Sequence, residues 1–280
     1  MTDPETISYV LLGVPAFGMV VYWSVTLYHI IRTVRHLPTA RSGIAMADRT
    51  PVEGNVVVVV PAHNEADVIE GLVESLREQD HPDLRVVLAL DRCTDRTAEV
   101  AHRAVGHDRR FAIIEIEHCP EDWAGKVHAI WEGLQRSGWF EDSDYLLFAD
   151  ADTIFDPACV RATLAIMRER ELDMLSLLST LTNDRWYELV AQTAAGWELL
   201  QQYPLERANR DSGRRAFANG QFMAFRREAY LAVGGHPSVR DALLEDLALA
   251  RLVEDEKLRT GVLLADGMLR CRMYRSYRDF

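Results

Sequence analysis

Five consecutive valines, Val56–Val60, constrain the fold of this chain more than any other feature. A β-branched run that is apolar on both faces is typical of an inner strand of a parallel sheet, with helices covering each side. Further apolar runs occur at 84–90, 111–116 and 145–149, and helical patterns separate them. Strands that alternate with helices in this way predict an α/β fold with a doubly wound, mostly parallel sheet.

The helices between these strands are predicted from apolar periodicity and from capping residues. Pro61 ends the valine run, Asn64 resembles an N-cap, and apolar residues then recur at helical spacing over 68–76. Further helices are expected over 94–104, 126–134 and 157–169, followed by a short strand over 174–179.

The amino-terminal region contains a long uncharged stretch, since Ile7–Ile31 has no Asp, Glu, Lys or Arg. A helix of about 25 residues spans roughly 37 Å, enough to cross a hydrocarbon core of ~30 Å. Arg32, Arg35 and Arg41 follow the span, so the positive-inside rule predicts an amino terminus outside and a cytoplasmic domain. A signal peptide would carry its basic residues before the apolar run, which favours a retained single-pass membrane anchor.

The chain therefore divides into three predicted parts. Residues 1–35 form the transmembrane anchor, and the polar, Pro- and Gly-containing residues 36–54 form a linker. The soluble domain covers 55–280, with a Rossmann-like nucleotide-binding half at 55–152 and an acceptor half at 153–280.

A second apolar helix is predicted further along the chain. Trp186, Leu189, Val190, Ala194 and Trp197 recur at helical spacing. Such a stripe is typical of a core helix, and an anchor upstream leaves an interfacial helix as the alternative.

The segment YLLFADADTIF, residues 145–155, delivers two carboxylates, Asp150 and Asp152, at the carboxyl end of a predicted strand. Ligands bind at that end of an open α/β sheet. Two acids one residue apart suit a divalent cation and a phosphate-bearing substrate. Phosphatases of the haloacid dehalogenase type share Asp-x-Asp, but they have Thr or Val where this chain has Ile154, and a pair of solvated loop acids is the remaining alternative.

Three more signals fall where the alternating fold would bring them to the same place. The loop PAHNE (61–65) joins a strand to a helix, where backbone N–H groups can meet a phosphate. Asp91 directly follows a strand and can accept a hydrogen bond from a uracil N–H or a ribose hydroxyl. Glu245 and Asp246 open a helix, where its dipole stabilises negative charge. For a lone acid, helix capping is the simpler interpretation.

Composition excludes one class of function and singles out one lysine. A formal net charge of −12 argues against a nucleic-acid binder. Lys126 is one of only two lysines in the chain. The four cysteines have no metal-ligand spacing and are expected as reduced thiols; they are Cys93, Cys119, Cys159 and Cys271.

Together and in this order, these motifs resemble the family 2 glycosyltransferases of the GT-A fold, over 55 to about 278. The resemblance implies that PAHNE, with Pro61, Ala62, Asn64 and Glu65, forms the nucleotide loop.

The resemblance also implies a role for each acid. Asp91 is similar to the acid that contacts uracil. Family members usually have a second acid directly before it, and this chain has Leu90 there. Asp150 falls near the ribose and sugar, and Asp152 on the metal, either Mn²⁺ or Mg²⁺. AGK, ending at Lys126, resembles a Gly-Lys element near the donor. The remaining acid of the pattern, the Asp of Glu245-Asp246, is implied as the general base.

The segments 217–230, which include Gly220 and Gln221, and 234–236 are most similar to the membrane-anchored subset that glucosylates carotenoids, hopanoids and ceramides. Arg275 and Arg278 echo the Gln-x-x-Arg-Trp of processive members, but Asp279 stands in place of Trp, so polymerisation is not expected. The basic cluster Arg270, Arg272, Arg275 and Arg278 can serve as a phosphate site or contact anionic headgroups. A solvated basic tail is the alternative.

The leading hypothesis is thus an inverting, metal-dependent transferase that moves sugar from a UDP-sugar to a lipid or membrane-embedded hydroxyl. One alternative is transfer to a polyprenyl phosphate, whose ionised acceptor needs no base. Another is a membrane-tethered nucleotide-sugar-binding module, although a pure binder has no use for Asp246.

Overall fold

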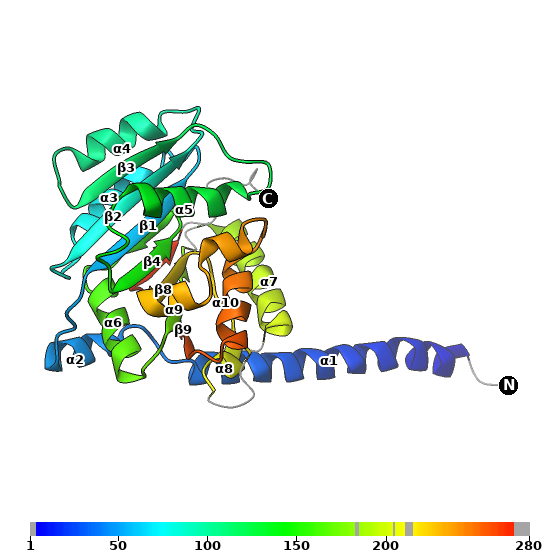
Figure 1. Cartoon of the computed structure of the whole chain (residues 1–280). Coiled ribbons are helices and arrows are strands. Elements are labelled where there is room, and N and C mark those ends of the chain that lie inside the picture. Colours follow the sequence, from blue (N-terminus) through cyan, green and yellow to red (C-terminus); the bar gives the residue numbers. More distant parts are fainter. Residues whose placement is uncertain (1–3, 183–184, 204, 211–214, 272–280) are drawn as a thin grey trace.

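The computed structural model describes residues 4–182, 185–203, 205–210 and 215–271, and Figure 1 shows their arrangement. A seven-stranded sheet forms the centre, with strand order β3-β2-β1-β4-β8-β6-β9. The strands are β1 (Val56–Ala62), β2 (Leu84–Asp91), β3 (Phe111–Ile116), β4 (Tyr145–Ala149), β6 (Met174–Leu178), β8 (Phe222–Arg226) and β9 (Thr260–Leu264).

The sheet is mostly parallel, as the sequence predicts. β1 pairs in parallel with β2 and β4, β2 with β3, and β6 with β9. Only β8, which lies between β4 and β6, runs antiparallel to its neighbours. The carboxyl ends of β1, β2 and β4 therefore meet at one edge, and this edge carries the predicted acids.

The valine run shows why the sheet needs helices on both faces. All five valines are buried, and successive side chains point to opposite faces. Val56, Val58 and Val60 join a core under one set of helices, while Val57 and Val59 join a second core on the other face. The first set is α3 (Ile69–Arg77), α4 (Thr97–Val105) and α6 (Cys159–Glu169); the second includes α5 (Gly125–Arg136) and α10 (Glu245–Asp255), and the short α9 (Arg227–Ala232) follows β8.

A small three-stranded sheet continues the chain beyond the acidic pair. β10 (Leu269–Cys271) lies between β5 (Thr153–Phe155) and β7 (Thr180–Leu181). This pairing brings Cys271, far away in sequence, next to the segment that follows Asp152.

Residues 36–54 differ from the linker that the sequence predicts. They contain α2 (Ser42–Arg49), which packs against α6 so closely that a Cβ on Gly43 would lie 2.1 Å from the carbonyl oxygen of Ala162. Ala40 is fully buried. Polar composition suggested an exposed linker, but glycine and alanine here allow close helix contact.

The N-cap prediction for Asn64 is wrong. The helix α3 begins only at Ile69, and Asn64 has a left-handed φ of 57°. Its Oδ1 accepts hydrogen bonds from the backbone N–H groups of Thr94 and Asp95 (2.8 and 3.2 Å). Asn64 therefore ties two loops together at the edge of the sheet.

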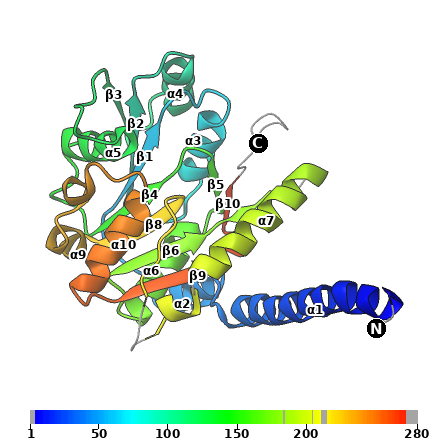
Figure 2. The same ribbon diagram turned by 90° about the vertical axis from the view of Figure 1, so that its right-hand side faces the viewer.

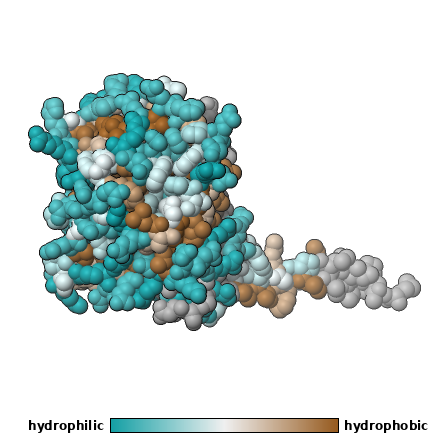
Figure 3. All heavy atoms as spheres, in the orientation of Figure 1, coloured by the Kyte–Doolittle hydropathy of each residue, from teal (hydrophilic) through white to brown (hydrophobic). Residues whose placement is uncertain are grey.

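Helix α1 (Pro4–His36) projects away from the rest of the molecule, as Figures 1 and 2 show. Its segment Leu12–Thr33 is long and apolar enough to cross a membrane. Leu12 is 73% exposed and Phe17 is 72% exposed, and apolar atoms are visible along the helix in Figure 3. The helix contacts the short α8 (Leu205–Ala208).

The second predicted apolar helix is present as α7 (Trp186–Gln202). Trp197 packs against Tyr22 and Trp23 of α1, with ring centroids 6.2 and 5.5 Å apart. Gln201 donates a hydrogen bond to the Tyr22 hydroxyl (2.8 Å). Helices α1 and α7 therefore lie against each other on one side of the molecule.

Candidate active site

A polar cleft of about 260 Å³ lies at the carboxyl edge of β1, β2 and β4. Asp91 is the last residue of β2, and Asp150 directly follows β4, so the parallel pairing puts both acids at this edge. The lining residues are Pro61, Ala62, His63, Glu65, Asp91, Lys126, Ala129, Asp150, Ala151 and Asp152.

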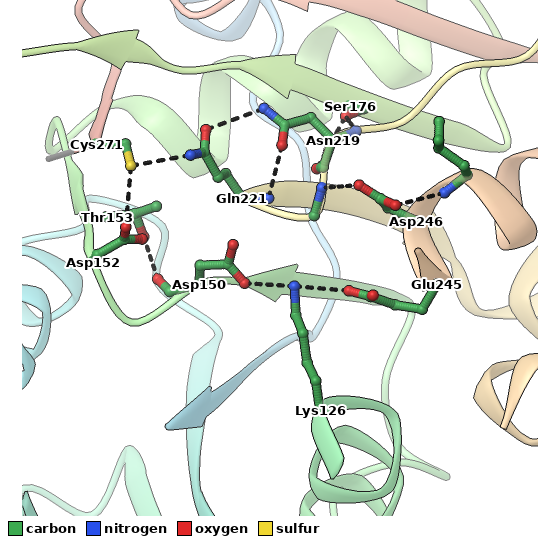
Figure 4. Close-up of polar contacts among 12 residues, drawn as sticks. Lys126, Asp150, Asp152, Thr153, Ser176, Asn219, Gln221, Glu245, Asp246 and Cys271 are labelled. Carbon is green, nitrogen blue, oxygen red and sulfur yellow. Dashed lines mark hydrogen bonds and ion pairs between the residues drawn. The ribbon is translucent and has the colours of Figure 1, made fainter. Parts of the chain in front are cut away.

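Lys126 joins the two halves of the domain. From the first turn of α5, its Nζ lies 2.7 Å from Asp150 Oδ1 and 2.7 Å from Glu245 Oε1 (Figure 4). Burial lowers the pKa of Lys126, but the charges of Asp150 and Glu245 outweigh it, so the pKa is raised. Its ammonium therefore stays charged and compensates one carboxylate from each half.

Asp246 is held with defined orientation beside this ion pair. Its Oδ2 accepts a hydrogen bond from the Gly220 N–H (2.8 Å) and its Oδ1 from the Leu247 N–H (2.7 Å). A Cβ on Gly220 would lie 2.8 Å from Lys126 Nζ, so a side chain there would require the lysine ammonium to shift. Glycine at this position lets the backbone lie close to the Lys126 ion pairs.

Asp152 is a buried acid whose environment favours a nearby positive charge. Burial raises its pKa, and the charge of Asp150 raises it further. Its Oδ2 accepts from the Cys271 thiol (3.3 Å), while its buried Oδ1 has no hydrogen-bond partner in the part of the chain that the structure describes. A divalent cation would compensate both features, so the residues fit a metal.

No group of three or more His, Cys, Asp or Glu side chains with metal-site geometry occurs among the described residues. A single carboxylate such as Asp152 also fits a cation site. Mg²⁺ is commonly bound in this way, by one or two carboxylates together with substrate phosphates and water.

Asp91 is 4% exposed and is already paired. Arg92 donates to both of its carboxylate oxygens, at 2.8 and 2.7 Å. The backbone carbonyl of Asp91 also contacts His63 Nδ1 (2.6 Å). The carboxylate is thus fixed in the cleft, and a ligand N–H would bind beside Arg92 at oxygen lone pairs that remain.

Of the four loop residues named from the sequence, Pro61, Ala62 and Glu65 line the cleft. Asn64 does not, because its side chain turns to the 94–95 loop. His63, within the same motif, lines the cleft and was not singled out, although its position between two named residues was the available signal.

Gln221 links Cys271, which contacts Asp152, to Asn219 and Ser179. Its Nε2 lies 3.0 Å from Cys271 Sγ, and its Oε1 accepts from Asn219 (3.1 Å) and from the Ser179 hydroxyl. Figure 4 shows this row of side chains above the Asp150–Lys126–Glu245 row. Cys271 carries no local sequence signal, since only the pairing of β10 with β5 brings it here.

Of the four arginines in the predicted basic cluster, Arg270 lies among the described residues. Arg270 lies on β10 and is exposed. Arg272, Arg275 and Arg278 fall outside the described residues.

Comparison with known proteins identifies the family. Residues 57–234 match the model of "Glycosyl transferase family 2". The chain is 26% identical over 226 residues to the 4,4'-diaponeurosporenoate glycosyltransferase of Staphylococcus aureus, covering 78% of this chain and 56% of that protein. It is also 26% identical over 148 residues to the poly-beta-1,6-N-acetyl-D-glucosamine synthase of Staphylococcus epidermidis, covering 52% of this chain but 32% of that protein.

Solved structures agree on the fold. The mannosyltransferase PcManGT of Pyrobaculum calidifontis, in complex with GDP-Man and Mn²⁺, aligns over 96% of this chain and 68% of its own, with a TM-score of 0.62 and 18% identity. TarS of S. aureus in complex with UDP-GlcNAc aligns over 79% of this chain and 59% of its own, with a TM-score of 0.56 and 15% identity. The chain spans only part of the length of these curated relatives; it belongs to glycosyl transferase family 2 and has a GT-A-like fold.

Proposed function

We propose that this enzyme is an inverting, metal-dependent glycosyltransferase that moves a sugar from a UDP-sugar to the hydroxyl of a lipid or membrane-embedded acceptor. The observation that carries the proposal is the Asp150–Lys126–Glu245 ion-pair row. It ties the carboxyl end of β4 to the start of α10, so the cleft and Asp246 belong to one assembly.

The polar cleft suits a nucleotide diphosphate-sugar. Asp91 accepts from the uracil N–H, and Lys126 and Asp150 lie where the sugar and diphosphate would extend. Asp152 would hold the metal, Mn²⁺ or Mg²⁺, which would supply positive charge against the charge that develops on the leaving diphosphate. Solved relatives of the fold bind UDP-GlcNAc or GDP-Man, which supports a nucleotide-sugar donor.

Asp246 acts as the general base. The acceptor hydroxyl attacks the anomeric carbon from the face opposite the diphosphate, and its proton passes to the Asp246 carboxylate. Attack from the opposite face inverts the anomeric configuration, so a UDP-α-sugar gives a β-glycoside. The N–H groups of Gly220 and Leu247 hold the carboxylate in place, which is the preorganisation that general-base catalysis needs.

The acceptor lies in or at a membrane. The exposed apolar surface of α1 supports a membrane anchor, and Arg32, Arg35 and Arg41 support an amino terminus outside and a cytoplasmic catalytic domain. A relative named for a carotenoid acid, diaponeurosporenoate, supports an apolar acceptor.

The test is UDP release from UDP-glucose by the full chain in detergent, with Mn²⁺ or Mg²⁺ and a lipid extract. Asp152→Asn should abolish release and weaken UDP binding in Mn²⁺, because one charge leaves the cation site. Asp241→Asn, which removes an exposed carboxylate near Asp246, is the control and should behave as wild type. Full activity of Asp152→Asn, or full activity of wild type in EDTA, would contradict the metal assignment.

A further inference from the structure

A second, larger cavity borders the active site on the acceptor side. Its volume is about 550 Å³, within the range of small-molecule sites. Its walls are mainly apolar, contributed by α1, β6, α7, α8, β9 and α10, as well as the segment before β8. Leu178, Leu199, Phe217, Leu247 and Leu264 give it this character.

One polar part of the cavity lies at Asp246. Asp246 lines it together with Asn219, Gln221 and Ser179, which are joined by the hydrogen bonds described above. Asp246 supplies a carboxylate to the cavity lining. As the proposed general base, it has use for an acceptor that still carries a proton, which a hydroxyl does and an ionised phosphate does not.

The remaining wall follows α1 and α7. Thr33 and Leu37 near the end of α1, and Leu199 and Tyr203 at the end of α7, line the cavity. Since α1 is the candidate membrane span, the cavity lies beside the part of the protein that would meet the bilayer.

Two leucines extend the apolar surface in front of the base. Leu244 lines the cavity and is 62% exposed, and its neighbour Leu243 is 91% exposed. Exposed apolar side chains that continue the surface of an apolar cavity are typical of a site that a ligand or lipid covers. The two precede Glu245 and Asp246 directly, so a hydrocarbon that covers them is near the base.

We propose that this cavity binds the hydrocarbon chain of the acceptor and that the acceptor presents a neutral hydroxyl to Asp246. The inference rests on the proposed function and narrows its substrate to an uncharged, long-chain alcohol-type lipid rather than a lipid phosphate. In the reaction, the bond between the anomeric carbon and the diphosphate oxygen breaks and a bond to the hydroxyl oxygen forms. The hydroxyl proton goes to Asp246, and UDP leaves with the bonding electron pair.

Gly196 offers a direct way to close the cavity. It lies on α7 and lines the cavity, and a Cβ there would meet nothing within 4 Å. The Cβ of Gly196→Phe is therefore accommodated, its ring adds volume at the cavity wall, and loss of a helix-interior glycine does not weaken α7. Glu198→Phe is the matched control, because Glu198 is an exposed residue of the same helix outside the cavity lining.

The experiment uses the full chain in detergent and a hexadecanol with a photoreactive diazirine in its chain. Wild type should be labelled on α7 and on 243–247. Labelling should fall about tenfold or more in Gly196→Phe and stay at the wild-type level in Glu198→Phe. Unlabelled hexadecanol should compete with the probe about tenfold better than hexadecyl phosphate.

Equal labelling of Gly196→Phe and wild type would overturn the cavity assignment, as would no labelling of wild type. Equal or better competition by hexadecyl phosphate would overturn the neutral head and favour a lipid phosphate. UDP binding, measured in parallel, should be unchanged in both variants. Failure of wild type to bind UDP or release it from UDP-glucose would instead count against the proposed function, independently of the labelling result.

Discussion

The polar cleft, proposed as the donor site, and the apolar cavity, proposed as the acceptor site, both lie near the Lys126–Glu245 ion pair, and they are built by different means. The cleft is polar, and most of its side chains come from short motifs at the ends of β1, β2 and β4. The cavity is apolar, and it combines segments from Thr33 to Leu264 with no motif of their own. Charge at fixed positions defines the first region, and shape defines the second.

This difference indicates where each property of the enzyme originates. Ion pairs and backbone N–H groups fix the donor side, so single-charge changes there should alter chemistry. Apolar surface defines the acceptor side, so changes of volume should alter which lipid binds. Asp246 lies between the two regions. It lines the apolar cavity, and it accepts a hydrogen bond from Gly220, whose backbone lies close to Lys126 of the polar cleft.

The largest effect is expected at that boundary. Asp246→Asn should reduce transfer by roughly 10² to 10⁴-fold, because the amide cannot take the hydroxyl proton, while UDP affinity stays near wild type. Transfer rates and UDP titration measure the two quantities. Asp255→Asn, an exposed acid on the same helix, should change neither. A parallel collapse of UDP affinity would mean that the two regions are not separable at Asp246.

A smaller effect is expected from backbone approach on the donor side. Gly220→Ala puts a Cβ 2.8 Å from Lys126 Nζ, so the ammonium must move out of its position between Asp150 and Glu245. Turnover should fall by about 10- to 100-fold, in line with the sensitivity of catalysis to displacements near 1 Å.

Gly196→Ala tests the same change on the acceptor side, where the new Cβ meets nothing within 4 Å. Turnover should stay within about twofold of wild type, and stability should rise by up to ~1 kcal/mol, as for glycine in a helix interior. Equal loss of turnover in Gly220→Ala and Gly196→Ala would show that the polar cleft and the apolar cavity do not differ in their tolerance of an added methyl group.

The last effect concerns the stability of the fold next to the polar cleft. Burial lowers the pKa of His236 to about 3, with a further contribution from the charge of Lys126. The ring is fully buried against Phe148, and its Nδ1 contacts the Tyr230 hydroxyl (2.8 Å). The unfolded chain binds a proton at His236 below pH ~6.5, whereas the folded chain does so only near pH 3.

The contribution of His236 to stability should therefore be complete above pH ~6.5 and decrease by about 1.4 kcal/mol per pH unit below it, until pH ~3. Urea unfolding at pH 7 and pH 5.5 measures the change. His236→Leu should show a smaller difference between the two pH values, whatever its absolute stability. An equal difference in wild type and variant would show that His236 does not titrate in this way.

The alternation of strands and helices could be predicted from sequence because each element is encoded locally. A β-branched run such as Val56–Val60 and the helical spacing after it depend on residues a few positions apart. For the same reason the sequence predicts that Asp91 and Asp150, at the carboxyl ends of two strands, lie close together. Parallel pairing brings these strand ends to one edge of the sheet.

Predictions from local sequence were wrong where contacts between distant segments determine the structure. Residues 36–54 have linker composition, yet Gly43 allows α2 to pack on α6. Asn64 has the residue type of a helix cap, but two backbone N–H groups some 30 residues away donate hydrogen bonds to its side-chain oxygen. Propensity is a weak prior, and tertiary contacts override it.

The sequence by itself determined the sheet, the family and the position of the acids Asp91 and Asp150 at strand ends, because each follows from residues that are near neighbours in the chain. Only the tertiary structure decided that Cys271 contacts Asp152, that Lys126 joins Asp150 to Glu245, and that an apolar cavity reaches Asp246. These contacts join segments up to 119 residues apart, and a cavity is a space between side chains that no single segment encodes.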